Sequence, residues 1–123
     1  MSNVETFESP TMARIERGVR VIAHGTRLRL HGDLDLDTAP VFLDVVAARL
    51  TECSQHAVTA LQIDCADLDF CDSSGLAALI MAHQRAEAAG VRLDLAAQPE
   101  HLRRLFQLCG LGTLFPAESD SAG

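Results

Sequence analysis

Apolar residues recur at every second position in two short runs near the start of the chain. Valine and alanine do so over residues 19–23 and leucine over residues 28–30, with His24-Gly25-Thr26 between them. A period of two places side chains on alternate faces of a strand, and a short break with glycine is typical of a turn. The pattern predicts a hairpin of two strands with one buried face.

Apolar residues at spacings of three and four predict three helices further along the chain. Proline falls in the first turn of two of them, and glycine follows the last turn of two, as is typical of helix boundaries. The expected boundaries are Asp37 or Thr38 to about Thr51, Asp72 to Gly90, and Gln98 to Gly110. A short apolar segment, 111–115, is expected to pack back on the core.

Residues 58–65 are apolar at almost every position, as in a central strand covered on both faces. An acidic loop is expected over 66–71 and a further strand over 91–95. Strands that alternate with helices predict an α/β fold: a mixed sheet of about four to five strands, parallel in its centre, with helices mainly on one face. The loops 32–38 and 66–74 then share one edge of the sheet.

The chain has the size of one domain, with 123 residues of which 48% are hydrophobic. We expect this domain over residues 13–116, between a flexible segment, 1–12, and a flexible tail, 117–123. The first residues lack the apolar core of a signal peptide, and no run approaches the length that spans a membrane. A cytoplasmic location is therefore expected.

A formal net charge of −7 and the absence of Trp and Tyr argue against binding to nucleic acid or to an anionic membrane. No CxxC pair occurs, and three of the four cysteines stand among apolar residues, so reduced thiols are expected. The cysteines are Cys53, Cys65, Cys71 and Cys109.

Motifs for catalysis, metals and nucleotides are missing from the sequence. The five histidines are scattered singly, which predicts no metal site. Residues 71–75 carry cysteine where the GxSxG motif of serine hydrolases has its first glycine, and no phosphate-binding GxxxxGK[ST] loop occurs. No cofactor is expected. An enzyme that pairs Ser73 with a histidine such as His31 stays open as an alternative.

Ser73 and Ser74 stand at the start of the second expected helix, where backbone N–H groups are unpaired and carry partial positive charge. Hydroxyls at this place either cap the helix or meet a phosphate, and the spacing alone favours capping. Four aspartates, Asp64, Asp67, Asp69 and Asp72, could in principle bind Mg²⁺, but Asp64 lies in the expected strand and the others follow no calcium-loop spacing. They form either a solvated acidic edge or a surface for a basic partner.

Several of these stretches together resemble the STAS domain, and within it the single-domain anti-sigma factor antagonists of bacteria. The resemblance covers about 15–115, and Cys71 departs from it where the family more often has an aliphatic residue. The matching stretches are Gly32-Asp33-Leu34-Asp35, Thr38-Ala39-Pro40, the strand ending at Asp64, Phe70-Cys71-Asp72-Ser73-Ser74-Gly75-Leu76, Gly90, and Leu105 to Phe115 with Cys109-Gly110-Leu111.

The resemblance implies a protein that is a substrate and not an enzyme. The unphosphorylated form binds an anti-sigma factor with serine-kinase activity and releases the sigma factor, phosphorylation on Ser73 switches binding off, and a phosphoserine phosphatase resets the protein. The implied partner-binding residues are Asp33, Asp35, Asp72, Ser73, Ser74, Gly75 and Leu76. A weak homodimer is compatible with the resemblance. The alternative within the family is a scaffold or transport-accessory protein that is never phosphorylated.

Overall fold

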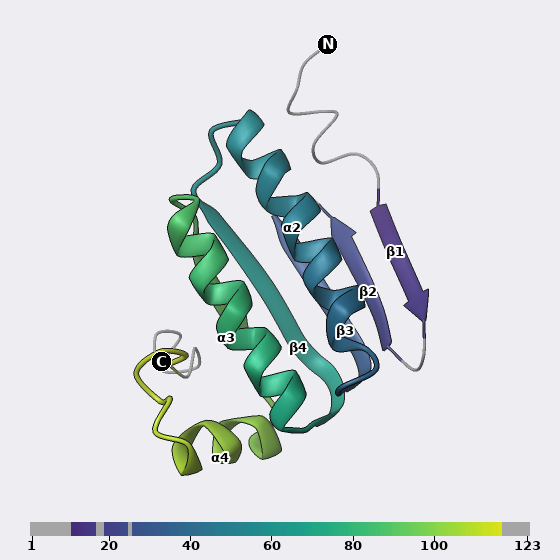
Figure 1. The fold of residues 1–123 in the computed structure, drawn as a ribbon, viewed down its shortest axis with the longest axis vertical. Helices are drawn as coiled ribbons and strands as arrows, with labels where there is room; N and C mark the ends of the chain where they lie inside the picture. The colour runs from purple at the N-terminus through teal and green to yellow at the C-terminus, as the bar shows by residue number, and fades with distance from the viewer. Residues whose placement is uncertain (1–10, 17–18, 25, 117–123) are drawn as a thin grey trace.

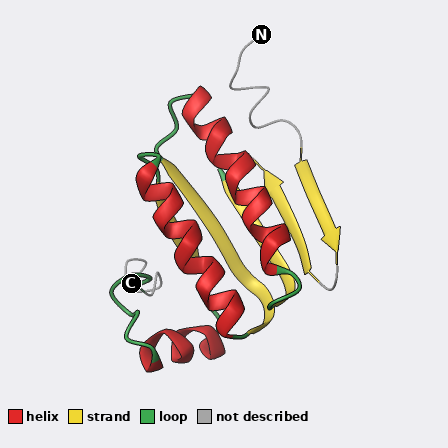
Figure 2. Ribbon diagram, viewed as in Figure 1, coloured by secondary structure: helices red, strands yellow, loops and turns green. Residues whose placement is uncertain are grey.

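The computed structural model describes residues 11–16, 19–24 and 26–116, with side chains from Thr26 onward (Figure 1). Thr11 and Met12 belong to a strand, and the rest of the expected end segments, 1–12 and 117–123, lies outside the described residues. Strands and helices alternate from the third strand onward (Figure 2). The elements are β1 Thr11–Glu16, β2 Val19–His24, β3 Arg27–Leu34, α2 Ala39–Gln55, β4 Ala60–Cys71, α3 Ser73–Ala88, β5 Arg92–Ala96 and α4 Glu100–Leu108.

The sheet has five strands in the order β1-β2-β3-β4-β5. β1, β2 and β3 pair antiparallel, whereas β3, β4 and β5 pair parallel. Helices α2 and α3 run side by side across one face (Figure 1). The predicted mixed α/β fold with a parallel centre and helices mainly on one face is therefore confirmed, as is the hairpin of β2 and β3. β1 was not predicted, because TMARIE shows little alternation.

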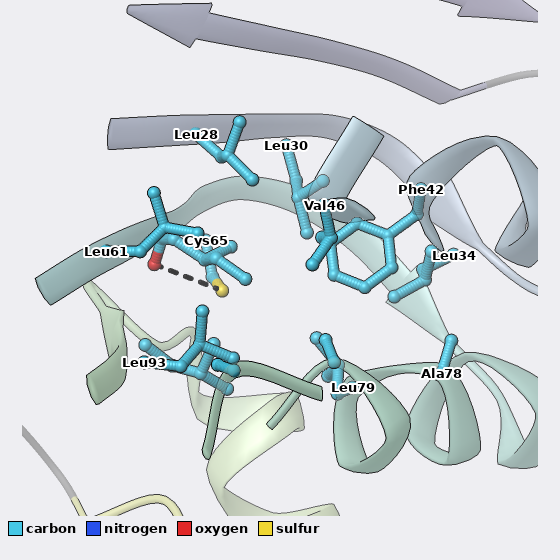
Figure 3. Close-up of a cluster of buried hydrophobic side chains, with 14 of the residues drawn as sticks. Leu28, Leu30, Leu34, Phe42, Val46, Leu61, Cys65, Ala78, Leu79 and Leu93 are labelled. Carbon is cyan, nitrogen blue, oxygen red and sulfur yellow. Dashed lines mark hydrogen bonds between the residues drawn. The ribbon is translucent and has the colours of Figure 1, made fainter. Parts of the chain in front are cut away.

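One face of the sheet carries the hydrophobic core, which the inner sides of α2 and α3 complete (Figure 3). Side chains at alternate positions of β3, β4 and β5 point into this core, and burying them is the main stabilising term of the fold. The core includes Leu28, Leu30, Leu34, Phe42, Val46, Leu61, Ile63, Cys65, Leu79, Leu93 and Leu95.

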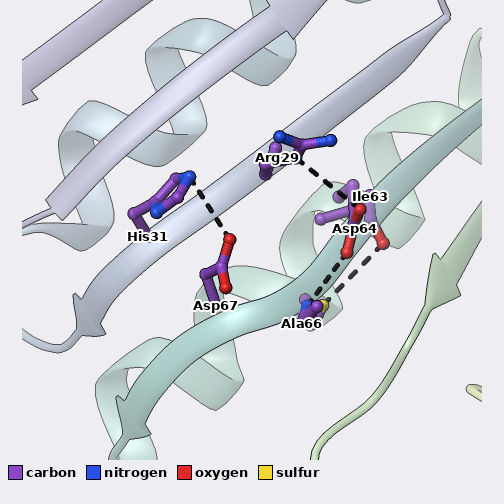
Figure 4. Close-up of polar contacts among 7 residues, drawn as sticks. Arg29, His31, Ile63, Asp64, Ala66 and Asp67 are labelled. Atoms are coloured by element: carbon purple, nitrogen blue, oxygen red, sulfur yellow. Dashed lines mark hydrogen bonds and ion pairs between the residues drawn. The ribbon is translucent and has the colours of Figure 1, made fainter.

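On β3 and β4 the opposite face of the sheet carries polar side chains. Arg29 Nε lies 3.7 Å from Asp64 Oδ2, and His31 Nε2 lies 3.5 Å from Asp67 Oδ2 (Figure 4). The expectation that 58–65 is covered on both faces is wrong, because Gln62 and Asp64 alternate with the buried residues and face outward.

β4 continues through residues 66–71, so the acidic loop expected there is wrong. The segment pairs with β3 up to Leu34 and Cys71. Two register shifts each place an extra residue on β4, one between Asp64 and Asp67 and one between Leu68 and Phe70. Such bulges change the burial period from two to three, so the segment shows none of the alternation that marks a regular strand.

Helices α3 and α4 end close to their expected glycines, Gly90 and Gly110. Gly90 has φ +76, and the N–H of Val91 donates to Ala86 O at 2.8 Å, which satisfies the end of α3. α2 runs to Gln55, four residues past the expected Thr51, because the fully buried Cys53 continues its apolar stripe.

The segment after α4 packs back on the core as expected. The ring centroid of Phe115 lies 5.0 Å from that of Phe106 and 5.6 Å from that of His83, which it meets edge-on. Gln98 Nε2 donates to the carbonyls of Leu95 and Pro116, each at 3.1 Å. Among the described residues, no helix combines the length and the apolar character needed to cross a bilayer.

Candidate functional site

The start of α3 is capped by an aspartate and not by a serine. Asp72 is the N-cap in extended conformation, and its Oδ1 accepts a hydrogen bond of 2.9 Å from the N–H of Gly75. Ser73 is the first helical residue and is exposed, while Ser74 is half-buried. Within residues 26–116, no hydrogen bond involves the Ser73 hydroxyl. The capping that the spacing favoured therefore falls to Asp72, and Ser73 Oγ remains accessible.

Gly75 allows the start of α3 to lie directly on the end of β3. A Cβ at this position would overlap the carbonyl oxygen of Leu34 and lie 2.9 Å from Cys71 Sγ. The same Leu34 carbonyl accepts a hydrogen bond of 3.3 Å from the N–H of Asp72. Gly75 and Leu76 are both buried, so these two members of the expected partner-binding set position the helix start through packing in the interior.

A hydrogen-bonded turn joins β3 to α2 beside this helix start. Asp35 Oδ1 accepts from the N–H of Asp37 at 3.0 Å and of Thr38 at 3.1 Å. Asp37 or Thr38 was predicted to be the N-cap of α2, and Thr38 holds this position. Its side chain is fully buried and makes no cap bond to the helix: Oγ1 donates to Asp33 O at 2.9 Å and accepts from the N–H of Asp35 at 2.8 Å. Thr38 therefore ties the turn to the end of β3.

We expect Thr38→Val to lower the free energy of unfolding by about 2 kcal/mol, because Asp33 O and the Asp35 N–H lose their partner where water is excluded. Thr51→Val is the matched control: the Thr51 hydroxyl bonds Ala47 O on an exposed helix surface, and the change should stay below about 0.5 kcal/mol. Urea unfolding of both variants measures the difference. Equal losses would show that the turn does not depend on Thr38.

The turn 35–38 and the start of α3 share one edge of the sheet, at the lower end of the view in Figure 1. The register pairs Asp33 with Phe70 and Leu34 with Cys71, which brings the two chain segments together as predicted. Sequence reasoning missed two exposed hydrophobic residues on this edge, Leu36 and Phe70. The sequence carried a signal for their exposure, since Leu36 stands between two aspartates and Phe70 follows Asp69.

The Cys71 thiol lies buried beneath the start of α3. Burial raises the pKa of Cys71 to about 12, and the charge of Asp72 adds to this effect. Burial likewise raises the pKa of Cys65 to about 12. Thiols with such pKa values stay protonated near neutral pH and are poor nucleophiles. All four cysteines are free, as expected, and Cys109 is the exposed one.

The structure does not bring His31 to Ser73 as a catalytic pair. Leu30 points into the core on the helix side of the sheet, so its neighbour His31 points to the other face, where it meets Asp67 (Figure 4). α3, which carries Ser73, covers the first of these faces. In the described residues no group of three His, Cys, Asp or Glu side chains is arranged to hold a metal ion.

Fold and site together define an α/β domain that presents a serine at a helix start over one edge of a mixed sheet. The family model described as "Mlab, STAS domain" matches residues 18–116. The chain belongs to the STAS domain family, as its resemblance predicted. Among curated protein sequences, none matches it.

Solved structures with the same fold include anti-sigma factor antagonists. One from Mycobacterium paratuberculosis is 24% identical with a TM-score of 0.62, over 88% of this chain and 83% of that one. SpoIIAA in its unphosphorylated form is 25% identical with a TM-score of 0.58, over 92% and 93% of the two chains. The Bacillus cell fate determinant SpoIIAA in its phosphorylated form is 20% identical with a TM-score of 0.56, over 92% and 96%.

Proposed function

We propose that this chain is an anti-sigma factor antagonist controlled by phosphorylation of Ser73. In its unphosphorylated form it binds an anti-sigma factor that has serine-kinase activity, and the sigma factor is released. Transfer of a phosphate from ATP to Ser73 Oγ then weakens the complex. A phosphoserine phosphatase restores the binding form, and the cycle takes place in the cytoplasm.

The observation that carries this proposal is the geometry of Ser73. It is exposed at the first position of α3, and the neighbouring Asp72 supplies the helix cap, so the hydroxyl is not needed to hold the fold. Membership of the STAS family supports the proposal. So does the fold shared with SpoIIAA, a protein that has been solved in unphosphorylated and phosphorylated forms.

A phosphate on Ser73 is compatible with the folded chain. The first turn of a helix offers unpaired N–H groups and partial positive charge, which favour an anion. The phosphate brings about −1.5 to −2 charges to a surface that must lose water when a partner docks. It also joins Asp72 and Asp33 on an edge that is already acidic. Repulsion and desolvation therefore weaken docking while the domain stays folded.

The chain acts in this scheme as a substrate. The kinase supplies the nucleotide site and the catalytic groups. The members of the partner-binding set that are not buried contact the kinase: Asp33, Asp35, Asp72, Ser73 and Ser74. Gly75 and Leu76 contribute by placing Ser73 correctly, since both are buried.

The test is an in vitro phosphorylation assay with purified serine-kinase anti-sigma factors from the source organism. With ATP, the cognate kinase should add a single phosphate to the wild-type chain and to Ser74→Ala, and none to Ser73→Ala. Intact mass spectrometry reads the result directly. Ser74→Ala is the matched control because it removes the adjacent hydroxyl, which is half-buried.

A phosphate on Ser73→Ala would show that another residue is the acceptor. A wild-type chain that accepts no phosphate from any of these kinases would favour the alternative, a STAS protein that is never phosphorylated.

A further inference from the structure

Four large hydrophobic side chains are exposed in the described part of the chain. They are Leu36, Phe70, Met81 and Leu108, with exposed fractions of 72%, 51%, 39% and 81%. Leu36 and Phe70 lie on the sheet edge that also holds the start of α3. Single exposed hydrophobic residues are ordinary, but these two are held in place by the backbone and have acidic neighbours.

Phe70 is turned outward by the second bulge of β4. The strand places two residues, Asp69 and Phe70, opposite the single step from Gly32 to Asp33. Leu68 and Cys71 on either side can thus both face the core, and Phe70 is left half-exposed opposite Asp33. Bulges commonly re-aim a side chain in this way.

Leu36 stands at the tip of the turn between β3 and α2. Asp35 Oδ1 accepts hydrogen bonds from the N–H groups of Asp37 and Thr38 and from the Thr38 hydroxyl, and these bonds close the turn that holds Leu36. The buried Thr38 fixes the base of the turn. Leu36 and Phe70 are therefore presented by hydrogen-bonded backbone, which lowers the entropy lost when a partner covers them.

Aspartates flank both side chains in the sequence, and Asp33 pairs with Phe70 across the two strands. The acidic residues of this edge are Asp33, Asp35, Asp37, Asp69 and Asp72. No Lys or Arg occurs in residues 30–48 or 50–84, so the two segments that form the edge contribute no lysine or arginine. An apolar centre with a charged rim is the usual organisation of a specific protein interface, and a rim of one sign selects a partner of the opposite sign.

We propose that Leu36 and Phe70 are the apolar anchors that hold the anti-sigma factor, and that the partner offers an apolar pocket rimmed by Arg and Lys side chains. This inference rests on the proposed function and adds to it the residues that give affinity and choice of partner. The carboxylate rim speeds the encounter, and the anchors slow dissociation. The phosphate on Ser73 prevents Leu36 and Phe70 from being buried in the partner's apolar pocket with water excluded.

The test measures binding of the purified serine-kinase anti-sigma factors to Leu36→Ser, Phe70→Ser and the control Leu108→Ser by isothermal titration calorimetry. Each anchor substitution should weaken binding about 30-fold or more, as for central interface residues. Leu108 is at least as exposed but lies on α4, so Leu108→Ser should bind within about twofold of wild type. Thermal unfolding checks that the three variants fold equally well.

Three results would overturn the inference. If both anchor variants bind with wild-type affinity, Leu36 and Phe70 are not the anchors, and the proposed function is unaffected. An equal loss in Leu108→Ser would show a general effect of surface polarity. If the wild-type chain self-associates in sedimentation velocity and Phe70→Ser abolishes this, the surface around Leu36 and Phe70 binds a second copy of the chain. Absence of any binding by the wild type would instead overturn the proposed function, and the anchors with it.

Discussion

Replacing Gly75 with alanine should lower the free energy of unfolding by about 3 kcal/mol, although alanine is the better helix former. The added Cβ would overlap the carbonyl oxygen of Leu34, which is backbone and cannot turn away. The start of α3 must then move off the end of β3. Because Ser73 sits two residues earlier in the same turn, the variant should also be a poorer kinase substrate.

Gly112→Ala is the matched control for this prediction. Nothing lies within 4 Å of a Cβ built at Gly112, so its stability should change by less than about 0.5 kcal/mol. Urea unfolding of the two variants gives the comparison. If Gly75→Ala is as stable as Gly112→Ala, the close approach of α3 to Leu34 is not a feature of the folded protein.

Placing a charge at position 73 should weaken binding to the anti-sigma factor about tenfold to a hundredfold without unfolding the domain. Ser73→Glu brings one carboxylate next to Asp72 in a surface that must be desolvated, and an uncompensated charge in such a place is costly. The helix start tolerates the charge in the free protein, because its N-terminus favours anions. Calorimetric titration measures the affinity, and thermal unfolding measures the stability.

Two controls separate charge from size and from position. Ser73→Gln has the shape of the glutamate variant without its charge and should keep most of the affinity. Gln84→Glu adds the same charge at an exposed position later on α3 and should bind as wild type. Equal weakening by Ser73→Gln and Ser73→Glu would mean that bulk, not charge, controls docking.

The fold could be predicted where a regular period marks each element. The hairpin of β2 and β3, the three helices and the parallel pairing of β3, β4 and β5 follow from periods of two and of three to four, with Gly90 and Gly110 at the helix ends. A serine hydroxyl was expected to cap α3, whereas the carboxylate of Asp72 does so by accepting from an N–H three residues ahead.

The errors arose where tertiary contacts decide the structure. Residues 66–71 extend β4 because β3 offers a pairing edge, and two bulges remove the period that would have revealed a strand. α2 continues to Gln55 because Cys53 finds a place in the core. Nor does sequence show that Thr38 would bond back to β3, or that Gly75 would touch Leu34, since both depend on how two segments meet.

The central claim is that a phosphate on Ser73 separates this chain from its partner, and a direct measurement compares the two forms of the same protein. The chain is phosphorylated in vitro, the site is located by peptide mass spectrometry, and the anti-sigma factor is titrated with the unmodified and the modified form. We expect one phosphate, on Ser73, and an affinity for the anti-sigma factor reduced at least about tenfold in the modified form. Equal affinity of the two forms, or a phosphate located outside Ser73, would contradict it.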